Sequence, residues 1–182
     1  LGAKAQLSHF QFTAGAITAR AQVFATFAGE DASLATRGVT LLKGKQHSDV
    51  TLVVDHAVPH GKSRELYKAV IDDAGKSVFQ GKIIVRQHAQ KTDGQMSSNA
   101  VLLSDDAEVA NKPELEIFAD DVVCAHGATT GSLDEKLKFY LKSRGIPDRE
   151  AEKLLIMAFL AEAIEEMERP EIGDILIGHI ES

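Results

Sequence analysis

The feature that most restricts the fold is a succession of short strand-like segments over the first 127 residues. Apolar and polar residues alternate there, or β-branched residues cluster, between polar turns and glycines. The expected strands lie at Leu7–Phe12, Ile17–Phe27, Ser33–Leu42, Thr51–Asp55, Leu66–Ile71, Val78, Ile83–Val85, Val101–Leu103 and Leu115–Phe118. Turns are expected at Gly15 and at residues 28–31, 43–45, 73–75 and 93–94. No ten-residue helical period precedes residue 133, so this part is predicted to be mainly β.

A weak internal repeat indicates how these strands are arranged. A pair of apolar residues precedes an acidic turn at Val70–Ala74, Leu102–Ala107 and Ile117–Val122. Strands that alternate with polar corners suit either the stacked turns of a β-solenoid or the strands of a β-sandwich. The solenoid is favoured because clean two-residue hairpin turns are few. Asn99 and Asn111 are expected at corners, since asparagine tolerates left-handed backbone.

The pattern becomes helical at Ser132. Ser132 and Glu135 form a capping-box pattern, which predicts a helix over Leu133–Ser143 that stops at Gly145. A second helix is predicted from Arg149 to about Glu168. The chain is therefore divided into a β domain, residues 1–131, and a helical domain, residues 132–182.

The centre of the second helix, residues 154–161, is apolar on every side. A surface helix shows one apolar stripe, so this centre is expected to be buried in the fold or against another chain. A short third helix is expected over residues 172–180. The residues of the second helix expected to bind a partner are Leu154, Met157, Ala158, Phe159 and Leu160.

Charge and composition argue against several functions. Twenty basic residues against 27 acidic ones give a net charge of −7, which disfavours nucleic acid or an anionic membrane as the main partner. The single cysteine cannot form an internal disulfide, which favours a reducing, cytoplasmic setting. No apolar run reaches membrane-spanning length, and no signal segment is recognisable. Because the chain begins at Leu1 in strand-like sequence, we interpret it as a fragment of a longer protein.

The main candidates for chemistry are Cys124 and His126. Two residues apart on a strand, their side chains share one face, where a thiolate and an imidazole can bind iron, zinc or sulfur intermediates. The alternative is that Cys124 is a small buried residue and His126 a hydrogen-bonded surface residue, because two ligands do not complete a metal site. A nucleophilic Cys–His pair is less favoured, since neighbours on a strand seldom have the third, orienting group.

Other candidate sites have less support. His56 and His60 flank Pro59, which argues against the helix that would bring both to one metal ion. The Asp-Asp pairs could be the paired carboxylates of a polysaccharide-cleaving β-helix enzyme, but acidic residues at turns are more often corners. No phosphate-binding glycine-rich loop with Lys and Ser/Thr is present, so the chain is not expected to hydrolyse nucleotide by itself.

The segment Pro113–Gly131, which reads PELEIFADDVVCAHGATTG, resembles the C-terminal core of the SufB/SufD family of iron–sulfur cluster assembly proteins. The resemblance includes residues 90–105 and 133–146 and covers about residues 48 to 168. The Cys-x-His-Gly-Ala-Thr form is similar to the SufD branch rather than to the SufB branch, which has a glutamate-histidine version.

This resemblance implies a right-handed β-helix followed by a small helical domain. It implies a SufB-like paralogue bound through the β-helix and a SufC-like ATPase bound through the C-terminal helices. Cluster assembly would occur between the two β-helices, with His126 implicated as an iron ligand and Cys124 as a second candidate beside it. The chain would then be a non-catalytic scaffold that holds iron or an iron–sulfur cluster transiently in the complex and no cofactor stably on its own.

Two other functions stay open beside the scaffold. One is a β-helix carbohydrate-active enzyme that uses Asp pairs, although the chain has no Trp to form a sugar platform. The other is a metal-binding structural module. An isolated chain could also form a homodimer, and the compartment would be the cytoplasm, or the plastid stroma in a photosynthetic eukaryote.

Overall fold

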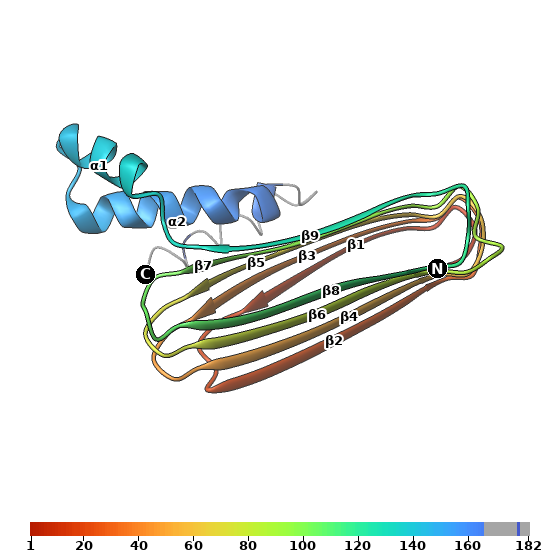
Figure 1. Ribbon diagram of the computed structural model, residues 1–182, viewed down its shortest axis with the longest axis horizontal. Coiled ribbons are helices and arrows are strands. Elements are labelled where there is room, and N and C mark those ends of the chain that lie inside the picture. The colour runs from red at the N-terminus through yellow and green to blue at the C-terminus, as the bar shows by residue number, and fades with distance from the viewer. Residues whose placement is uncertain (166–177, 179–182) are drawn as a thin grey trace.

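The computed structural model describes residues 1–165 and residue 178. Nine strands precede two helices in that part of the chain (Figure 1). The strands are β1 (Gln6–Thr13), β2 (Thr18–Phe27), β3 (Ser33–Leu42), β4 (His47–His56), β5 (Lys62–Ile71), β6 (Lys76–Val85), β7 (Asp93–Leu102), β8 (Glu108–Ile117) and β9 (Val123–Gly131). The helices are α1 (Glu135–Ser143) and α2 (Asp148–Glu165).

The strands form two parallel sheets that face each other. The odd-numbered strands β1-β3-β5-β7-β9 make one sheet and β2-β4-β6-β8 make the other. Each strand pairs with the strand two positions along the chain, as in Ser33 with Lys62 and Lys62 with Asp93. The chain therefore winds as a β-solenoid, which confirms the predicted β-helix followed by helices and excludes the sandwich.

The strand β3 coincides with its predicted bounds, and most other strands are longer than expected. The turn expected at residues 93–94 is wrong, because both residues begin β7. Asp93 takes part in the sheet through its backbone N–H, which donates to Gly61, while its carboxylate accepts a hydrogen bond from Arg64 at 2.6 Å. An aspartate and a glycine are thus accommodated in a strand because a neighbouring arginine pairs with the carboxylate.

The corners of the solenoid use left-handed backbone, but not at the asparagines. The left-handed positions at the end that precedes the odd-numbered strands are Lys4, Asp31, His60 and Lys91, with φ of 57°, 59°, 62° and 62°. Asn99 and Asn111 lie inside β7 and β8, so their predicted corner positions are wrong. The Asn99 amide donates to Thr129 on the neighbouring strand, and the Asn111 amide oxygen accepts from Ser98, so both side chains form hydrogen bonds within the solenoid.

The interior between the two sheets holds the main core. Inward-facing residues alternate with outward-facing ones along each strand, as expected for period-two side chains. The buried apolar residues of this interior include Phe27, Leu52, Val54, Phe79, Ile83, Val85 and Met96. Outside, ion pairs such as Arg20–Asp49 and Lys82–Glu116 link neighbouring strands of the even-numbered sheet.

Helix α2 packs on the outer face of the odd-numbered sheet (Figure 1). Leu160, Ala163 and Ile164 are buried there together with Val39, Val70 and Val101. The apolar character of this helix is thus partly explained by the sheet beneath it. The predicted extension to Glu168 and the third helix over 172–180 lie outside the described residues.

Helix α1 begins two residues later than predicted, because its N-cap is Asp134 rather than Ser132. The Asp134 carboxylate accepts hydrogen bonds from the N–H groups of Lys136 and Leu137. A carboxylate also interacts favourably with the positive end of the helix dipole, which explains why aspartate takes the cap from serine. The predicted stop is confirmed at Gly145, whose φ is +86°. Over the described part of the chain, neither helix has the length and hydropathy needed to cross a bilayer.

Candidate functional site

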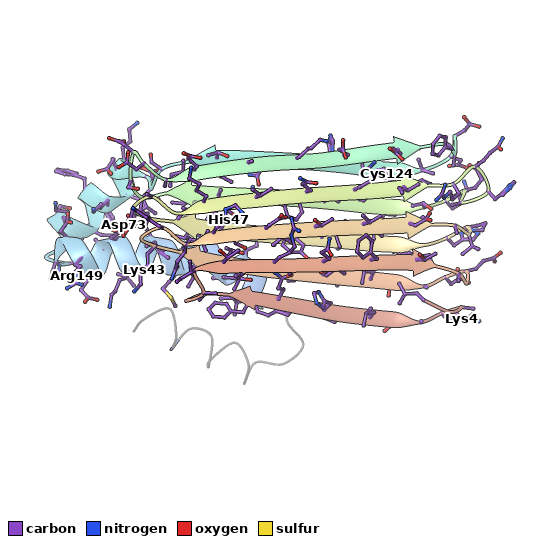
Figure 2. All side chains as sticks on the ribbon, turned by 90° about the horizontal axis from the view of Figure 1, so that it is seen from below. Lys4, Lys43, His47, Asp73, Cys124 and Arg149 are labelled. Atoms are coloured by element: carbon purple, nitrogen blue, oxygen red, sulfur yellow. The ribbon has the colours of Figure 1, made fainter. Side chains whose placement is uncertain are left out.

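The candidate site lies on β9, the last strand of the odd-numbered sheet. Cys124 pairs in register with Gly94 and His126 with Met96, and the side chains of both face the interior. The prediction that the two share one face is confirmed. Figure 2 shows Cys124 on the terminal turn, at the opposite edge of the solenoid from Lys4.

The terminal position of β9 determines how open these residues are. Within the described chain, β9 has a strand neighbour only on the β7 side. His126 is therefore exposed although it points toward the interior, and Cys124 is half-buried against the main core. An inward residue at the end of a solenoid can reach both the core and whatever covers that end.

The thiol of Cys124 is held in its neutral form. Burial raises the pKa of this thiol, the charges of Asp93 and Glu65 raise it further, and a hydrogen bond from the Gly94 backbone opposes them. A thiol in such surroundings is not a reactive nucleophile at neutral pH. A metal ion that replaces the thiol proton would still convert it to a thiolate ligand.

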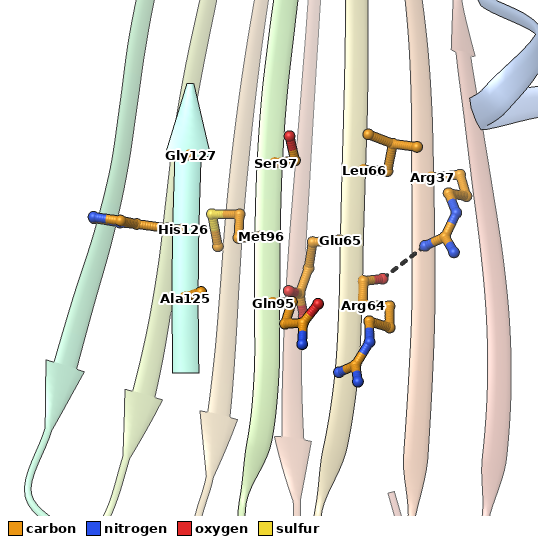
Figure 3. Close-up of a pocket in the computed structure, with 10 residues that line it drawn as sticks. All are labelled: Arg37, Arg64, Glu65, Leu66, Gln95, Met96, Ser97, Ala125, His126 and Gly127. Carbon is orange, nitrogen blue, oxygen red and sulfur yellow. Dashed lines mark hydrogen bonds between the residues drawn. The ribbon is translucent and has the colours of Figure 1, made fainter. Parts of the chain in front are cut away.

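His126 also borders a shallow depression of about 330 Å³ on β5, β7 and β9 (Figure 3). Arg37 and Arg64 lie at its far side, and Arg37 donates to the Arg64 backbone carbonyl at 2.9 Å. Arg64 also forms an ion pair with Asp93 at 2.6 Å. Small residues, Ser97 on β7 and Ala125 and Gly127 on β9, also line the depression.

The described residues do not complete a metal centre on their own. No group of three or more His, Cys, Asp and Glu side chains in the described chain is placed to hold a metal ion. Cys124 and His126 offer two ligands, whereas iron and zinc sites in proteins use at least three or four. Further ligands would have to come from a molecule that covers β9.

The other histidines do not form a site with each other. His56 is fully buried, stacks on Phe27 with ring centroids 4.2 Å apart, and lies 3.0 Å from the Ser63 hydroxyl. Burial lowers the pKa of His56 to about 4, although the neighbouring Asp55 opposes this shift. His60 is exposed at its corner. The four-residue spacing thus places one ring in the core and one in solvent.

The acidic pairs lie at corners or beside them. Asp73 accepts a hydrogen bond from the backbone N–H of Gly44 on the preceding turn, at 2.9 Å. Asp121 forms an ion pair with Lys91. These carboxylates connect successive turns of the solenoid, which is the structural role that acidic turn residues commonly have.

One functional candidate was missed from the sequence. Glu65 faces the interior from β5 and is 2% exposed, and neither carboxylate oxygen forms a well-aligned hydrogen bond within the described chain, although the Ser63 hydroxyl is close enough to lower its pKa. Burial raises its pKa to about 8, against the opposing effects of Ser63, Arg64 and Arg37. The available signal was the alternation Ser63, Glu65, Tyr67, which places this glutamate on the inward face of its strand.

The predicted partner-binding residues of α2 differ in accessibility. Leu154 is 48% exposed and Ala158 is also exposed, while Met157 is half-buried. Phe159 packs under Lys68, whose Nζ lies 4.6 Å from the ring centroid, and Leu160 is fully buried on the sheet. The exposed apolar side chains of the helix pair are Leu137, Phe139, Tyr140 and Leu154.

Comparisons with known proteins all match this chain to iron–sulfur cluster assembly proteins. The sequence profile described as "SUF system FeS cluster assembly, SufBD core domain" matches residues 1–159. The iron–sulfur cluster assembly protein SufD of Escherichia coli is 44% identical over 137 residues, which are 75% of this chain and 32% of that protein. An iron–sulfur cluster assembly SufBD family protein of Synechocystis is 42% identical over 71% of this chain and 28% of its own length. SufD of Bacillus subtilis is 34% identical over 80% of this chain and 33% of its own length. The chain thus spans about a third of these relatives.

Proposed function

The chain belongs to the SufBD core domain family of iron–sulfur cluster assembly proteins, and from this premise we propose that it is a non-catalytic scaffold on which a cluster is assembled. The observation that carries the proposal is the pair of an exposed His126 and a half-buried Cys124 on the terminal strand β9. This pair offers a thiol and an imidazole, which suit iron, yet it leaves the coordination incomplete. The site would act only when another chain covers it.

The free edge of β9 is suited to receive that other chain. An edge strand presents unpaired N–H and C=O groups, and natural proteins usually protect it with lysine, proline or charged residues. β9 contains none of these, since its sequence is VCAHGATTG. β8, at the edge of the other sheet, is protected by Lys112, Pro113 and Glu114. A SufB-like paralogue would therefore add its own strand to β9 and supply the missing ligands.

The helix pair is the proposed docking surface for a SufC-like ATPase. Leu137 and Phe139 on α1 are 52% and 72% exposed, Leu154 on α2 is 48% exposed, and exposed apolar residues on two short neighbouring helices favour an interface. The ATPase would supply the energy of assembly, because this chain offers no nucleotide-binding loop. A complex of this kind would work in the cytoplasm or in the plastid stroma.

The test of this proposal is the cluster content of the assembled complex. Replacement of His126 with Ala should lower cluster content strongly without preventing assembly, because the exposed imidazole contributes to coordination and not to the core. Cys124→Ser should have a smaller effect, since the half-buried thiol also packs against the core. The isolated chain should bind iron weakly or not at all.

The matched control is His60→Ala, which removes an exposed histidine from a corner away from β9. Cluster content is measured by iron and sulfide analysis of the purified complexes, and assembly by size-exclusion chromatography. A His126→Ala complex with as much cluster as the wild type would refute the proposed site.

A further inference from the structure

The corner that joins β8 to β9 carries exposed apolar side chains. Figure 1 shows this corner at the end of the solenoid that is remote from α1. Ile117, Phe118 and Val123 flank the corner and are 40%, 58% and 65% exposed. Cys124 follows directly in the chain. We refer to the side chains of Ile117, Phe118 and Val123 as the apolar rim.

The exposure of Ile117 follows from its place on the last turn of the solenoid. The strand registers put it in one inward column with Phe27, His56 and Val85, each of which is 0% exposed. A further strand stacked on β8 would bury Ile117 in the same way. Ile117 thus occupies a core position that no strand of the described chain covers.

Val123 needs another explanation, because it lies on the outer side of its strand. It continues the outward column of Ser33, Lys62 and Asp93, which are all polar or charged. On the preceding turn, Asp93 forms an ion pair with Arg64 at 2.6 Å. The last turn therefore has an exposed apolar side chain where the earlier turns have polar ones.

The same change occurs at Phe118. The backbone N–H of Phe118 donates to the Val85 carbonyl, as that of Arg86 donates to His56, so Phe118 holds the place that Arg86 holds one turn earlier. Arg86 forms an ion pair with Asp55 at 2.9 Å. A charged, paired side chain of one turn is thus replaced on the last turn by an exposed phenyl ring. Openness of the solenoid end does not account for this replacement, since it exposes inward positions only.

The apolar rim is continuous with the free edge of β9. A strand added at that edge would lie about 4.8 Å from β9, so the residues that flank the added strand would reach the adjoining corner. Backbone hydrogen bonds along an edge are the same for any partner strand, whereas side-chain contacts distinguish one partner from another. Exposed aromatic and aliphatic side chains gathered at one place favour such contacts.

We propose that the apolar rim anchors the SufB-like paralogue, with Phe118 and Val123 covered by an apolar patch of that protein while its strand pairs with β9. The inference rests on the proposed function and deepens it, because it names the side chains that hold the two chains together beside Cys124 and His126. Backbone pairing sets the register of the interface, and burial of the phenyl ring of Phe118 supplies a large part of its affinity.

The experiment is a calorimetric titration of the full-length protein with the SufB-like paralogue from the same organism. Phe118→Ser should weaken binding by about tenfold or more, as is typical of a buried aromatic anchor. Val123→Thr keeps the shape of the side chain and adds a hydroxyl, so it should also weaken binding. Phe118→Leu keeps an apolar side chain and should restore most of the affinity. Thermal unfolding of the separate variants should match the wild type, because both side chains are largely exposed.

The matched control is Phe24→Ser. Phe24 is 68% exposed and lies on β2, the strand at the opposite edge of the even-numbered sheet from β8, so its replacement should leave the affinity unchanged. The heat-capacity change of binding is a second readout on the same samples. Apolar burial makes this change negative, so its magnitude should be smaller for Phe118→Ser than for the wild type or for Phe24→Ser.

Wild-type affinity of both Phe118→Ser and Val123→Thr would overturn the inference. An equal loss of affinity in Phe24→Ser would also overturn it, because the loss would then not be specific to the apolar rim. Neither result affects the scaffold proposal, which is tested by the cluster content of the His126→Ala complex.

Discussion

Glu65 is one of the buried groups that make the stability of the solenoid depend on pH. Its pKa is raised from 4.5 to about 8, primarily by burial, while the Ser63 hydroxyl and the charges of Arg64 and Arg37 lower it. The unfolded chain loses this proton near pH 4.5, whereas the folded chain keeps it until about pH 8. Glu65 therefore takes up a proton on folding between these values, and its contribution to the free energy of unfolding falls as pH rises through that window.

Replacing Glu65 with Gln should remove this pH dependence. The two proteins should have similar stability near pH 5, where both side chains are neutral, and the variant should be the more stable by a few kcal/mol at pH 8. Urea unfolding at pH 5, 6.5 and 8 measures the difference, with Glu30→Gln as the control for an exposed carboxyl. A stability difference that stays constant from pH 5 to pH 8 would show that Glu65 is ionised in the fold.

Part of the candidate site around Cys124 and His126 could be predicted from the sequence alone. The shared face of Cys124 and His126 is a local property, because side chains alternate along any strand. The position of Glu65 beside Met96 is not local, since it depends on the number of residues in two corners and on the register they produce. The exposure of His126 was also beyond the local pattern, because it follows from β9 being the terminal strand.

The individual elements were predicted with unequal success, for physical reasons. Strand β3 is regular and buried, so hydrophobic alternation gave both of its ends. Strand β7 begins with Asp93 and Gly94, which are turn residues by composition and remain in the sheet because of Arg64. Helix α2 was expected to be buried in the fold or against another chain. Its sequence could not show that Lys68 lies beneath it, because Lys68 is 91 residues earlier in the chain than its partner Phe159.

Lys68 is the polar attachment of α2 to the sheet. Its Nζ donates to the Phe159 carbonyl at 2.6 Å and to the Glu162 carboxylate at 2.5 Å, and the Lys68 side chain is only 6% exposed. Lys68→Met keeps most of the aliphatic stem and should cost about 1–3 kcal/mol, chiefly through the lost hydrogen bond to the carbonyl, because Glu162 is largely exposed.

The loss should be local to α2. Hydrogen exchange should show faster amide exchange over residues 151–165 in Lys68→Met and unchanged exchange in strands β4 and β6. Lys62→Met, which removes an exposed lysine from the same strand, is the matched control. Unchanged protection of α2 in Lys68→Met would mean that the apolar contacts of Leu160 and Ile164 alone hold the helix in place.

At the scale of the whole molecule, the solenoid leaves two kinds of edge at its terminal turn. The backbone N–H of Glu108 points toward β6. Because successive N–H groups of a strand point to opposite sides, the backbone nitrogen of Pro113 faces the free edge of β8. The proline therefore removes no hydrogen bond of the sheet. Val123 likewise donates toward β7, so the N–H groups of Cys124, His126 and Ala128 face the free edge of β9. One edge is closed by proline, and the other remains open beside the candidate ligands.

This asymmetry allows a sharp test of the proposed pairing. Ala128→Pro removes one N–H from the free edge of β9 and none from the pairing with β7, so the folded chain should keep nearly its full stability. The complex with a SufB-like paralogue should be weakened or lost, because a strand added at this edge would lack a donor and meet the proline ring. Thr129→Pro removes an N–H that faces β7 and should instead destabilise the chain itself. Thermal unfolding of each variant and light scattering of the co-purified complex distinguish the two effects. A stable, full-size complex of the Ala128→Pro variant would mean that the paralogue binds elsewhere and that Cys124 and His126 are not covered by an added strand.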